Sequence, residues 1–124
     1  MTDKKKVVLI GLHPDEVDFS HWPGLDADKL LRSLEAQREQ LEELGLETAL
    51  CLVDTGGTAT EVVTDTLDAD TFECVVIGAG IRRVEDHFLL FEKILNLVHE
   101  HAPTARIALN TGPDDTVDAV RRWI

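Results

Sequence analysis

The chain has 124 residues, a mass of 13.8 kDa, 44% hydrophobic residues and 29% charged residues, which suits one globular domain spanning residues 1–124. Lys and Arg number 12 against 24 Asp and Glu, so the formal net charge is −12 and the sequence pI is about 4.6. Nucleic acids and anionic membrane surfaces both need a positive protein surface, so this charge disfavours both as partners.

The first predicted element is a strand over residues 5–12. After the initial lysines the run is β-branched and continuously apolar, which is typical of a strand covered on both faces of a parallel sheet. The apolar run is shorter than a signal-peptide core and far shorter than a membrane span. No other stretch approaches such a length, so we expect a cytoplasmic protein.

An unusually long connector follows, over residues 13–24, where loops of this kind usually have 2–6 residues. It is either a surface loop anchored by Phe19 and Trp22 or a lid over the edge of the sheet. As a lid it would bring histidines and carboxylates to a site. These are His13, Asp15, Glu16, Asp18 and His21. Such a set suits proton transfer or a divalent metal, but these five residues have neither HxH nor HExxH spacing and we assign no metal site.

Two strand–helix units occupy the middle of the chain. Asp26 is expected to cap a helix that ends at Gly45, with leucines at helical spacing on one face. Residues 47–54 form the second predicted strand, which ends at Asp54. Thr58 and Glu61 then have the spacing of a capping box at the start of a second helix.

The third predicted strand covers residues 72–78, and a long helix is expected over residues 84–101. Its core stripe on a helical wheel consists of Val84, Phe88, Phe91, Ile94, Leu95 and Val98. Leu90 and Leu97 widen this stripe to nearly half the circumference. They would form either a homodimer face or an extra contact with a neighbouring helix of the same chain.

The fourth predicted strand, residues 105–109, ends at Asn110 and Thr111, and Pro113 is expected at the first position of the last helix. Four alternations of strand and helix predict a three-layer α/β/α sandwich with a four-stranded parallel sheet. The expected strand order is 2-1-3-4, which is Rossmann-like or flavodoxin-like. In this order Cys51 and Cys74 lie on either side of the first strand, too far apart for a disulfide.

Open sheets of this kind bind ligands beyond the carboxyl ends of their strands, where the strand order reverses. Polar residues and glycines follow each predicted strand, whereas the strands themselves carry almost none. We expect ligand-binding residues among Asp54, Gly78, Gly80, Arg82, Asn110 and Thr111. Glycine lets backbone amides approach an anion, and Arg82 would add a fixed positive charge. The loop lacks the third glycine of a dinucleotide fingerprint and follows the third strand instead of the first.

Four segments carry a resemblance to known proteins. They are Gly11-Leu12-His13-Pro14, Cys51-Leu52-Val53-Asp54, Cys74-Val75-Val76-Ile77-Gly78-Ala79-Gly80-Ile81-Arg82 and Val98-His99-Glu100-His101-Ala102-Pro103. Through them the chain resembles a small family of bacterial one-domain proteins of unknown function with a Rossmann-like or flavodoxin-like core. The resemblance spans nearly the whole chain and implies this fold, with no particular reaction and no particular cofactor.

Three functions remain open from the sequence. The first is a binding domain for a small anionic molecule at the carboxyl edge of the sheet. The second is an enzyme in which His13, oriented by Asp15 or Asp18, acts as acid or base beside Arg82. The third is a non-catalytic interaction module that pairs with a second copy through Leu90 and Leu97. A phosphate-binding Walker loop, a G-x-S-x-G nucleophile elbow and a CxxC motif are all missing from the sequence.

Overall fold

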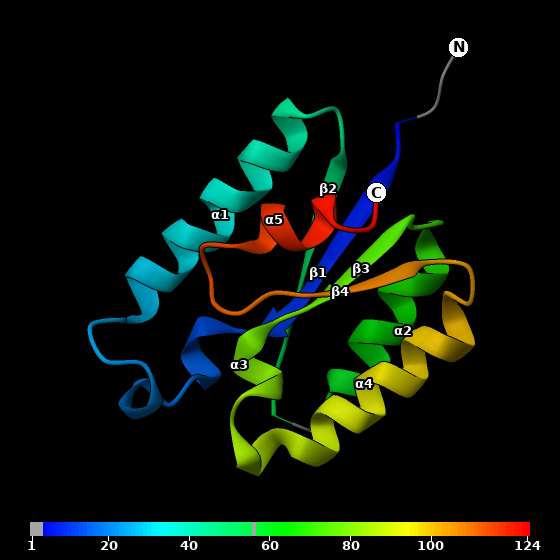
Figure 1. The fold of residues 1–124 in the computed structure, drawn as a ribbon. Helices are drawn as coiled ribbons and strands as arrows, with labels where there is room; N and C mark the ends of the chain where they lie inside the picture. The colour runs from blue at the N-terminus through cyan, green and yellow to red at the C-terminus, as the bar shows by residue number, and fades with distance from the viewer. Residues whose placement is uncertain (1–3, 56) are drawn as a thin grey trace.

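The computed structural model describes residues 4–55 and 57–124 and contains a four-stranded parallel sheet (Figure 1). The strands are β1 (Lys6–Leu12), β2 (Glu47–Val53), β3 (Cys74–Ile77) and β4 (Arg106–Leu109). Their order in the sheet is β2-β1-β3-β4, with all three pairings parallel. The predicted fold class and strand order are therefore confirmed.

Helices cover both faces of this sheet. They are α1 (Ala27–Glu43), α2 (Ala59–Ala69), α3 (Ala79–Arg82), α4 (Phe88–His101) and α5 (Thr116–Arg121). Figure 1 shows α1 and α5 on one side of the sheet and α2 and α4 on the other, while the short α3 follows the end of β3. No helix in the described part of the chain has the length and apolar composition needed to cross a lipid bilayer.

The side chains of β1 alternate between two apolar cores. Val8, Ile10 and Leu12 belong to the core shared with α2 and α4, whereas Val7 and Leu9 belong to the core shared with α1 and α5. Burial on both faces explains why this strand is continuously apolar. The strand order β2-β1-β3-β4 places the carboxyl end of β1 between β2 and β3, at the centre of the sheet's carboxyl edge.

Helix boundaries match the predicted signals in part. Asp26 caps α1, because its Oδ1 accepts a hydrogen bond from the Lys29 N–H at 2.8 Å, and Gly45 ends the turn after α1 with a φ of 85°. The capping box predicted at Thr58 is wrong, since its hydroxyl donates to Asp54 instead. Pro113 precedes the last helix, which begins only at Thr116.

The predicted core stripe of the long helix is wrong at Phe88, whose exposed fraction is 61%. The other predicted stripe residues are in the core or against it: Val84, Ile94 and Val98 are buried, and Phe91 and Leu95 pack against the core. Phe88 follows a 3₁₀ turn, η3 (Glu85–His87), so the chain from Val84 is not one continuous helix. Leu90 is also in the core, with an exposed fraction of 7%, and Leu97 packs against it. The two leucines predicted as a possible dimer face therefore make contacts within the chain.

The two cysteines are free and buried, on β2 and β3, with β1 between them. Burial raises the pKa of both thiols, to about 11 for Cys74, and a hydrogen bond from Thr66 opposes the effect at Cys51. Thiols with raised pKa values remain protonated at neutral pH and are poor nucleophiles. They serve as small core residues.

Candidate functional site

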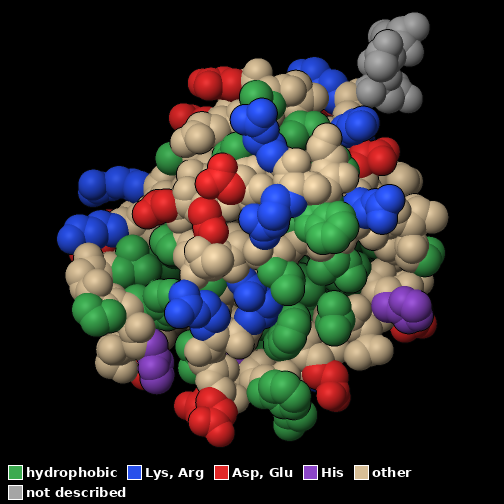
Figure 2. Space-filling view, viewed as in Figure 1, with side chains coloured by type: hydrophobic (Ala, Val, Ile, Leu, Met, Phe, Trp, Pro, Cys, Tyr) green, Lys and Arg blue, Asp and Glu red, His purple; other side chains and the backbone are tan. Residues whose placement is uncertain are grey.

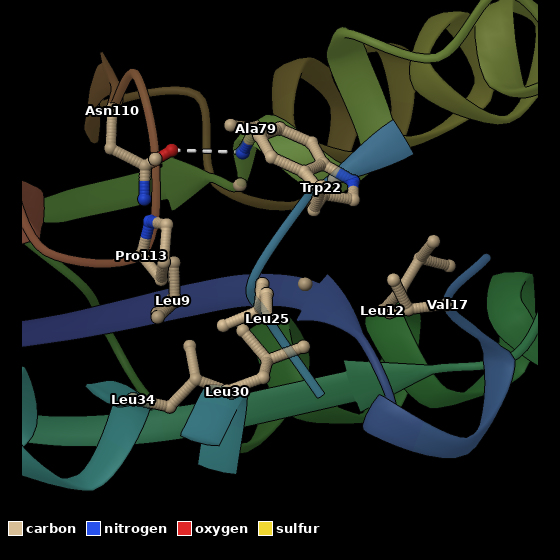
Figure 3. A pocket seen from close by; sticks show the side chains of 14 residues that line it. Leu9, Leu12, Val17, Trp22, Leu25, Leu30, Leu34, Ala79, Asn110 and Pro113 are labelled. Atoms are coloured by element: carbon tan, nitrogen blue, oxygen red, sulfur yellow. Dashed lines mark hydrogen bonds between the residues drawn. The ribbon is translucent and has the colours of Figure 1, made fainter. Parts of the chain in front are cut away.

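A pocket lies at the carboxyl edge of the sheet, where the ends of β1 and β3 meet and the strand order reverses. Most of its lining is aliphatic or aromatic. The lining residues are Leu9, Gly11, Leu12, Val17, Trp22, Leu25, Leu30, Leu34, Gly78, Ala79, Gly80, Asn110, Gly112 and Pro113. Figure 3 shows these side chains converging from β1, α1, the connector after β1 and the start of α3. The sheet edge predicted as the site is therefore hollow, and its walls are mainly apolar.

Two glycines of the predicted loop have different roles at this pocket. The Gly78 N–H donates to the Ile10 carbonyl at 2.8 Å, and a Cβ at Gly78 would lie 3.3 Å from that same oxygen. Gly78 is thus required by the close approach of β3 to β1. A Cβ at Gly80 would meet no heavy atom within 4 Å, so Gly80 leaves open space at the pocket wall.

The amide groups at the start of α3 are nearly all paired. The Ala79 N–H donates to Asn110 Oδ1 at 2.8 Å, and the Ile81 and Arg82 amides both donate to the Gly78 carbonyl. Among the hydrogen bonds of the described residues, none uses the Gly80 N–H.

The long connector forms one wall of the pocket. It contains two short 3₁₀ turns, η1 (Pro14–Glu16) and η2 (Phe19–His21), which direct Val17, Trp22 and Leu25 inward. The structure thus has one feature of the predicted surface loop and one of the predicted lid. It is an ordered loop whose apolar residues cover part of the sheet edge.

The polar residues of this connector are exposed and serve its turns. His13 Nδ1 accepts a hydrogen bond from the Asp15 N–H at 3.1 Å, and Asp18 Oδ1 accepts one from the Ser20 N–H at 3.0 Å. None of the three side chains in the predicted acid–base set lines the pocket. The catalytic role of His13 and Asp15 stays a prediction, and this geometry does not favour it.

Asn110 connects three elements below the pocket. Its Oδ1 accepts from the Ala79 N–H, its Nδ2 donates to Thr116 Oγ1 at 3.0 Å, and its backbone carbonyl accepts from Arg82 Nη2. The side chain is buried, so these contacts satisfy polar atoms that water does not reach. Asn110 lines the pocket, but its amide is committed to holding β4, α3 and α5 together.

Arg82 is likewise committed to the backbone. Its Nε donates to the Ile77 carbonyl at 2.9 Å, and Nη2 donates to both oxygens of Asn110. Burial lowers the pKa of Arg82, the neighbouring Arg83 lowers it further, and Asp115 opposes the shift. The guanidinium therefore braces the ends of β3 and β4 and does not line the pocket.

Asp54 and Asp115 close loops by the same chemistry. Asp54 accepts from the N–H and hydroxyl of Thr58, at 3.1 and 2.9 Å. Asp115 accepts from the N–H and hydroxyl of Thr111, at 2.9 and 2.7 Å, and from the Gly112 N–H. Burial disfavours the Asp115 carboxylate, but these hydrogen bonds outweigh it and lower its pKa. Asp54 and Thr111 do not line the pocket, and their predicted ligand-binding role stays untested.

A larger and shallower hollow of about 410 Å³ adjoins the pocket. The two share Trp22, Leu25 and Pro113, and the hollow adds Arg83 and His21. The Arg83 guanidinium carbon lies 5.6 Å from the centre of the Trp22 ring, within the range of a cation–π interaction. Arg83 Nη1 also donates to the Thr111 carbonyl at 2.7 Å. The mouth of the apolar pocket thus carries a positive charge.

The structure therefore brings together only some of the predicted site residues. Gly78, Gly80 and Asn110 line the pocket, with Arg82 directly behind Asn110. Arg83 and the α1 residues Leu30 and Leu34 also line these hollows and were not predicted as site residues; the leucines were predicted only as one face of a helix. Trp22 was the available signal, because a tryptophan within a long loop requires an apolar surface to cover.

Within residues 4–55 and 57–124 there is no group of three His, Cys, Asp or Glu side chains placed to hold a metal ion. Comparison with models of known protein families finds none that matches the chain, and comparison with curated proteins finds no match either. The resemblance to a bacterial one-domain family stays a prediction.

Proposed function

We propose that this chain binds a small amphiphilic carboxylate, with the apolar part of the ligand in the pocket and its charged end at the pocket mouth. The observation that carries the proposal is the position and lining of the pocket. It is an apolar hollow at the reversal point of the sheet, where open α/β folds bind their ligands.

The size of the pocket sets the size of the apolar part. Its volume is about 50 Å³, whereas one enclosed water needs roughly 10–15 Å³. The pocket therefore accommodates a short aliphatic segment and is too small for a nucleotide base. Ligand sites in proteins usually have volumes of several hundred Å³. The rest of the ligand would occupy the adjoining hollow.

Two donors support a negative charge at the mouth. Gly80 lines the pocket, and no hydrogen bond in the described part of the chain uses its N–H. The Arg83 guanidinium lies beside Trp22 in the adjoining hollow. Arg83 is exposed, and only some of its five N–H groups are used. A carboxylate accepts hydrogen bonds from both kinds of donor.

Binding is better supported than catalysis. Among the described residues that line the pocket, Asn110 and Trp22 alone have polar side chains, and the Asn110 amide is already hydrogen-bonded on both sides. General acid–base chemistry requires a titratable group within hydrogen-bond reach of the reacting atom. The pocket lining offers none, so we place no reaction there.

The proposal is tested by calorimetric titration with straight-chain carboxylates of increasing length and with the matching neutral amides. Affinity should rise roughly fourfold for each added methylene until the pocket is filled, because each buried CH₂ contributes about 0.8 kcal/mol. Each carboxylate should bind more tightly than its amide. Equal affinities across the series, or no binding by any member, would rule the proposal out.

A charge variant locates the carboxylate. Arg83→Gln removes the positive charge at the mouth, so it should weaken binding of the carboxylates and leave binding of the amides unchanged. Arg121→Gln is the matched control, since it removes one exposed arginine from α5 and leaves the hollow intact. If both variants weaken carboxylate binding equally, the effect reflects net charge and not the proposed contact.

A further inference from the structure

The outer edge of β4 carries unpaired backbone groups. β4 pairs only with β3, and the Arg106 N–H donates to the Glu73 carbonyl at 2.9 Å. Backbone groups alternate along a strand, so those of Arg106 and Ala108 point towards β3 and those of Ile107 and Leu109 point away from it. Arg122 Nη2 donates to the Leu109 carbonyl at 2.8 Å. The hydrogen bonds of the described residues leave the Ile107 N–H, the Ile107 carbonyl and the Leu109 N–H open.

Leu109, the last residue of β4, has an exposed apolar side chain. Trp123 and Ile124, which follow α5 in the chain, are exposed as well, Trp123 with an exposed fraction of 52%. Figure 2 shows hydrophobic side chains gathered around the position of β4 in Figure 1, with Lys and Arg side chains beside them. An edge strand with open backbone groups is a template for pairing with another chain. This edge combines such groups with the exposed apolar side chain of Leu109.

The two faces of β4 differ in chemistry. Ile107 packs against the core formed with α2 and α4, so Leu109, two residues later, lies on that same face. Ala108 belongs to the core formed with α1 and α5, which places Arg106 on the other face. Arg122 follows α5 directly, on this second side of the sheet. Trp123 and Ile124 follow Arg122 in the chain. A strand added beside β4 would therefore meet Ile107 and Leu109 on one face and arginines on the other.

We propose that the free edge of β4 binds an extended peptide segment in which acidic and aliphatic side chains alternate. The peptide backbone pairs with the open groups of Ile107 and Leu109 and extends the sheet by one strand. Its aliphatic side chains lie on the face of Leu109. Its carboxylates lie on the opposite face, beside Arg106 and Arg122, whose charges are of the opposite sign.

Charge disfavours a second copy of the chain as the occupant. A two-fold pairing of β4 with its own copy brings the same side chains of each copy to the same interface. The arginines that flank this edge would then face arginines. A separate acidic segment avoids this repulsion and gains from the local arginines.

The test measures fluorescence anisotropy of a labelled peptide of about ten residues, the length of a long strand, in which Glu and Val alternate. Two control peptides are a Lys and Val alternation and a block peptide with all Glu residues before all Val residues. The alternating acidic peptide should bind at least about tenfold more tightly than either control, because like charges directly opposite cost binding free energy. Absence of binding, or equal binding by the three peptides, would overturn the proposal.

Backbone pairing is tested by a matched pair of variants at one position. Leu109→Pro removes an N–H that points away from β3, a change that edge strands tolerate, whereas Leu109→Ile retains both the N–H and an apolar side chain of the same size. Circular dichroism and a thermal melt establish that each variant is folded. The Pro variant should lose peptide binding and the Ile variant should retain most of it. Equal binding by two folded variants would contradict strand addition.

The contacts with Arg106 and Arg122 are tested with separate variants. This test does not require the Leu109→Pro variant to fold. Arg106→Gln and Arg122→Gln should each weaken binding by roughly three- to fivefold, as expected for an exposed charge pair. Arg38→Gln removes an exposed arginine from α1 and should have no effect. Equal weakening by all three variants would contradict the proposed contacts. If light scattering shows that the parent chain is a dimer and that Leu109→Pro abolishes the dimer, the occupant of the β4 edge is a second copy of the chain and not a peptide.

Discussion

The two sides of the sheet's carboxyl edge use their residues in opposite ways. On the side of β3 and β4, the polar groups of Arg82, Asn110 and Thr116 are hydrogen-bonded to one another and to the backbone. On the side of β1, apolar side chains from α1 and the connector surround an open pocket. Polar residues at strand ends are therefore not necessarily ligand groups. Here Arg82, Asn110 and Thr116 form a hydrogen-bonded polar frame at the ends of β3 and β4, and the pocket lies beside this frame.

The largest expected effect is at the centre of the polar frame. Asn110→Ala removes the acceptor of the Ala79 N–H and the donor to Thr116 Oγ1, both in buried surroundings. Unfolding by denaturant should show a loss of about 2–4 kcal/mol. Asn96→Ala is the control, because it removes a single hydrogen bond from an exposed asparagine on α4. A loss below about 1 kcal/mol at Asn110 would mean that the frame is not structural.

A smaller effect is expected where the frame meets β1. Gly78→Ala places a Cβ 3.3 Å from the Ile10 carbonyl oxygen, and backbone on both sides limits the adjustment. The free energy of unfolding should fall by about 1–3 kcal/mol, the range for overpacked sites. The φ of Gly78 is −68°, which alanine also adopts, so the loss would be steric. An unchanged stability would show that the two strands can separate without cost.

The pH dependence of stability isolates Asp115. Hydrogen bonds lower its pKa in the folded state below the usual 3.8. Its contribution is therefore fully present above the unfolded pKa and is lost as pH falls through the folded pKa. Asp115→Asn should be less stable than the parent at neutral pH, and the difference should shrink below about pH 4. A difference that stays constant down to about pH 2 would contradict this role.

The smallest effect on stability, with the opposite sign, is expected at the pocket wall. Gly80→Ala adds a methyl group to open space within α3 and should stabilise the chain by about 0.5 kcal/mol, since alanine favours helix over glycine. The same methyl group narrows the pocket, so carboxylate affinity should fall. Denaturant unfolding measures the stability of the variant, and calorimetry on the same preparation measures its carboxylate affinity. A destabilised variant with unchanged affinity would contradict the assignment of Gly80 to the wall.

The fold could be predicted because its signals are local and repeated. The continuous apolar run of β1 and the cap at Asp26 each follow from neighbouring residues, and chirality then limits the strand order. The exposure of Phe88 could not be predicted in this way. It follows a 3₁₀ turn, Glu85–His87, which no residue pattern marks and which interrupts the helix expected from Val84.

The candidate site could be predicted in position but not in chemistry. Strand ends identify the edge, and Gly80 and Asn110 were correctly placed at it. The sequence cannot show which polar groups are used internally, because Arg82 finds its partner 28 residues away. Nor does it show that Trp22 folds back over Leu25 and the pocket, since that depends on the path of the whole connector.

The most direct test of the account follows amide and indole NMR signals during titration with a medium-chain carboxylate. The account predicts that the Gly80 amide and the Trp22 indole N–H shift together and saturate at one ligand concentration, while the Thr58 amide, held by Asp54, stays in place. Shifts that spread over the exposed arginines of the whole surface, or a Gly80 amide that does not move, would contradict a ligand site in this pocket.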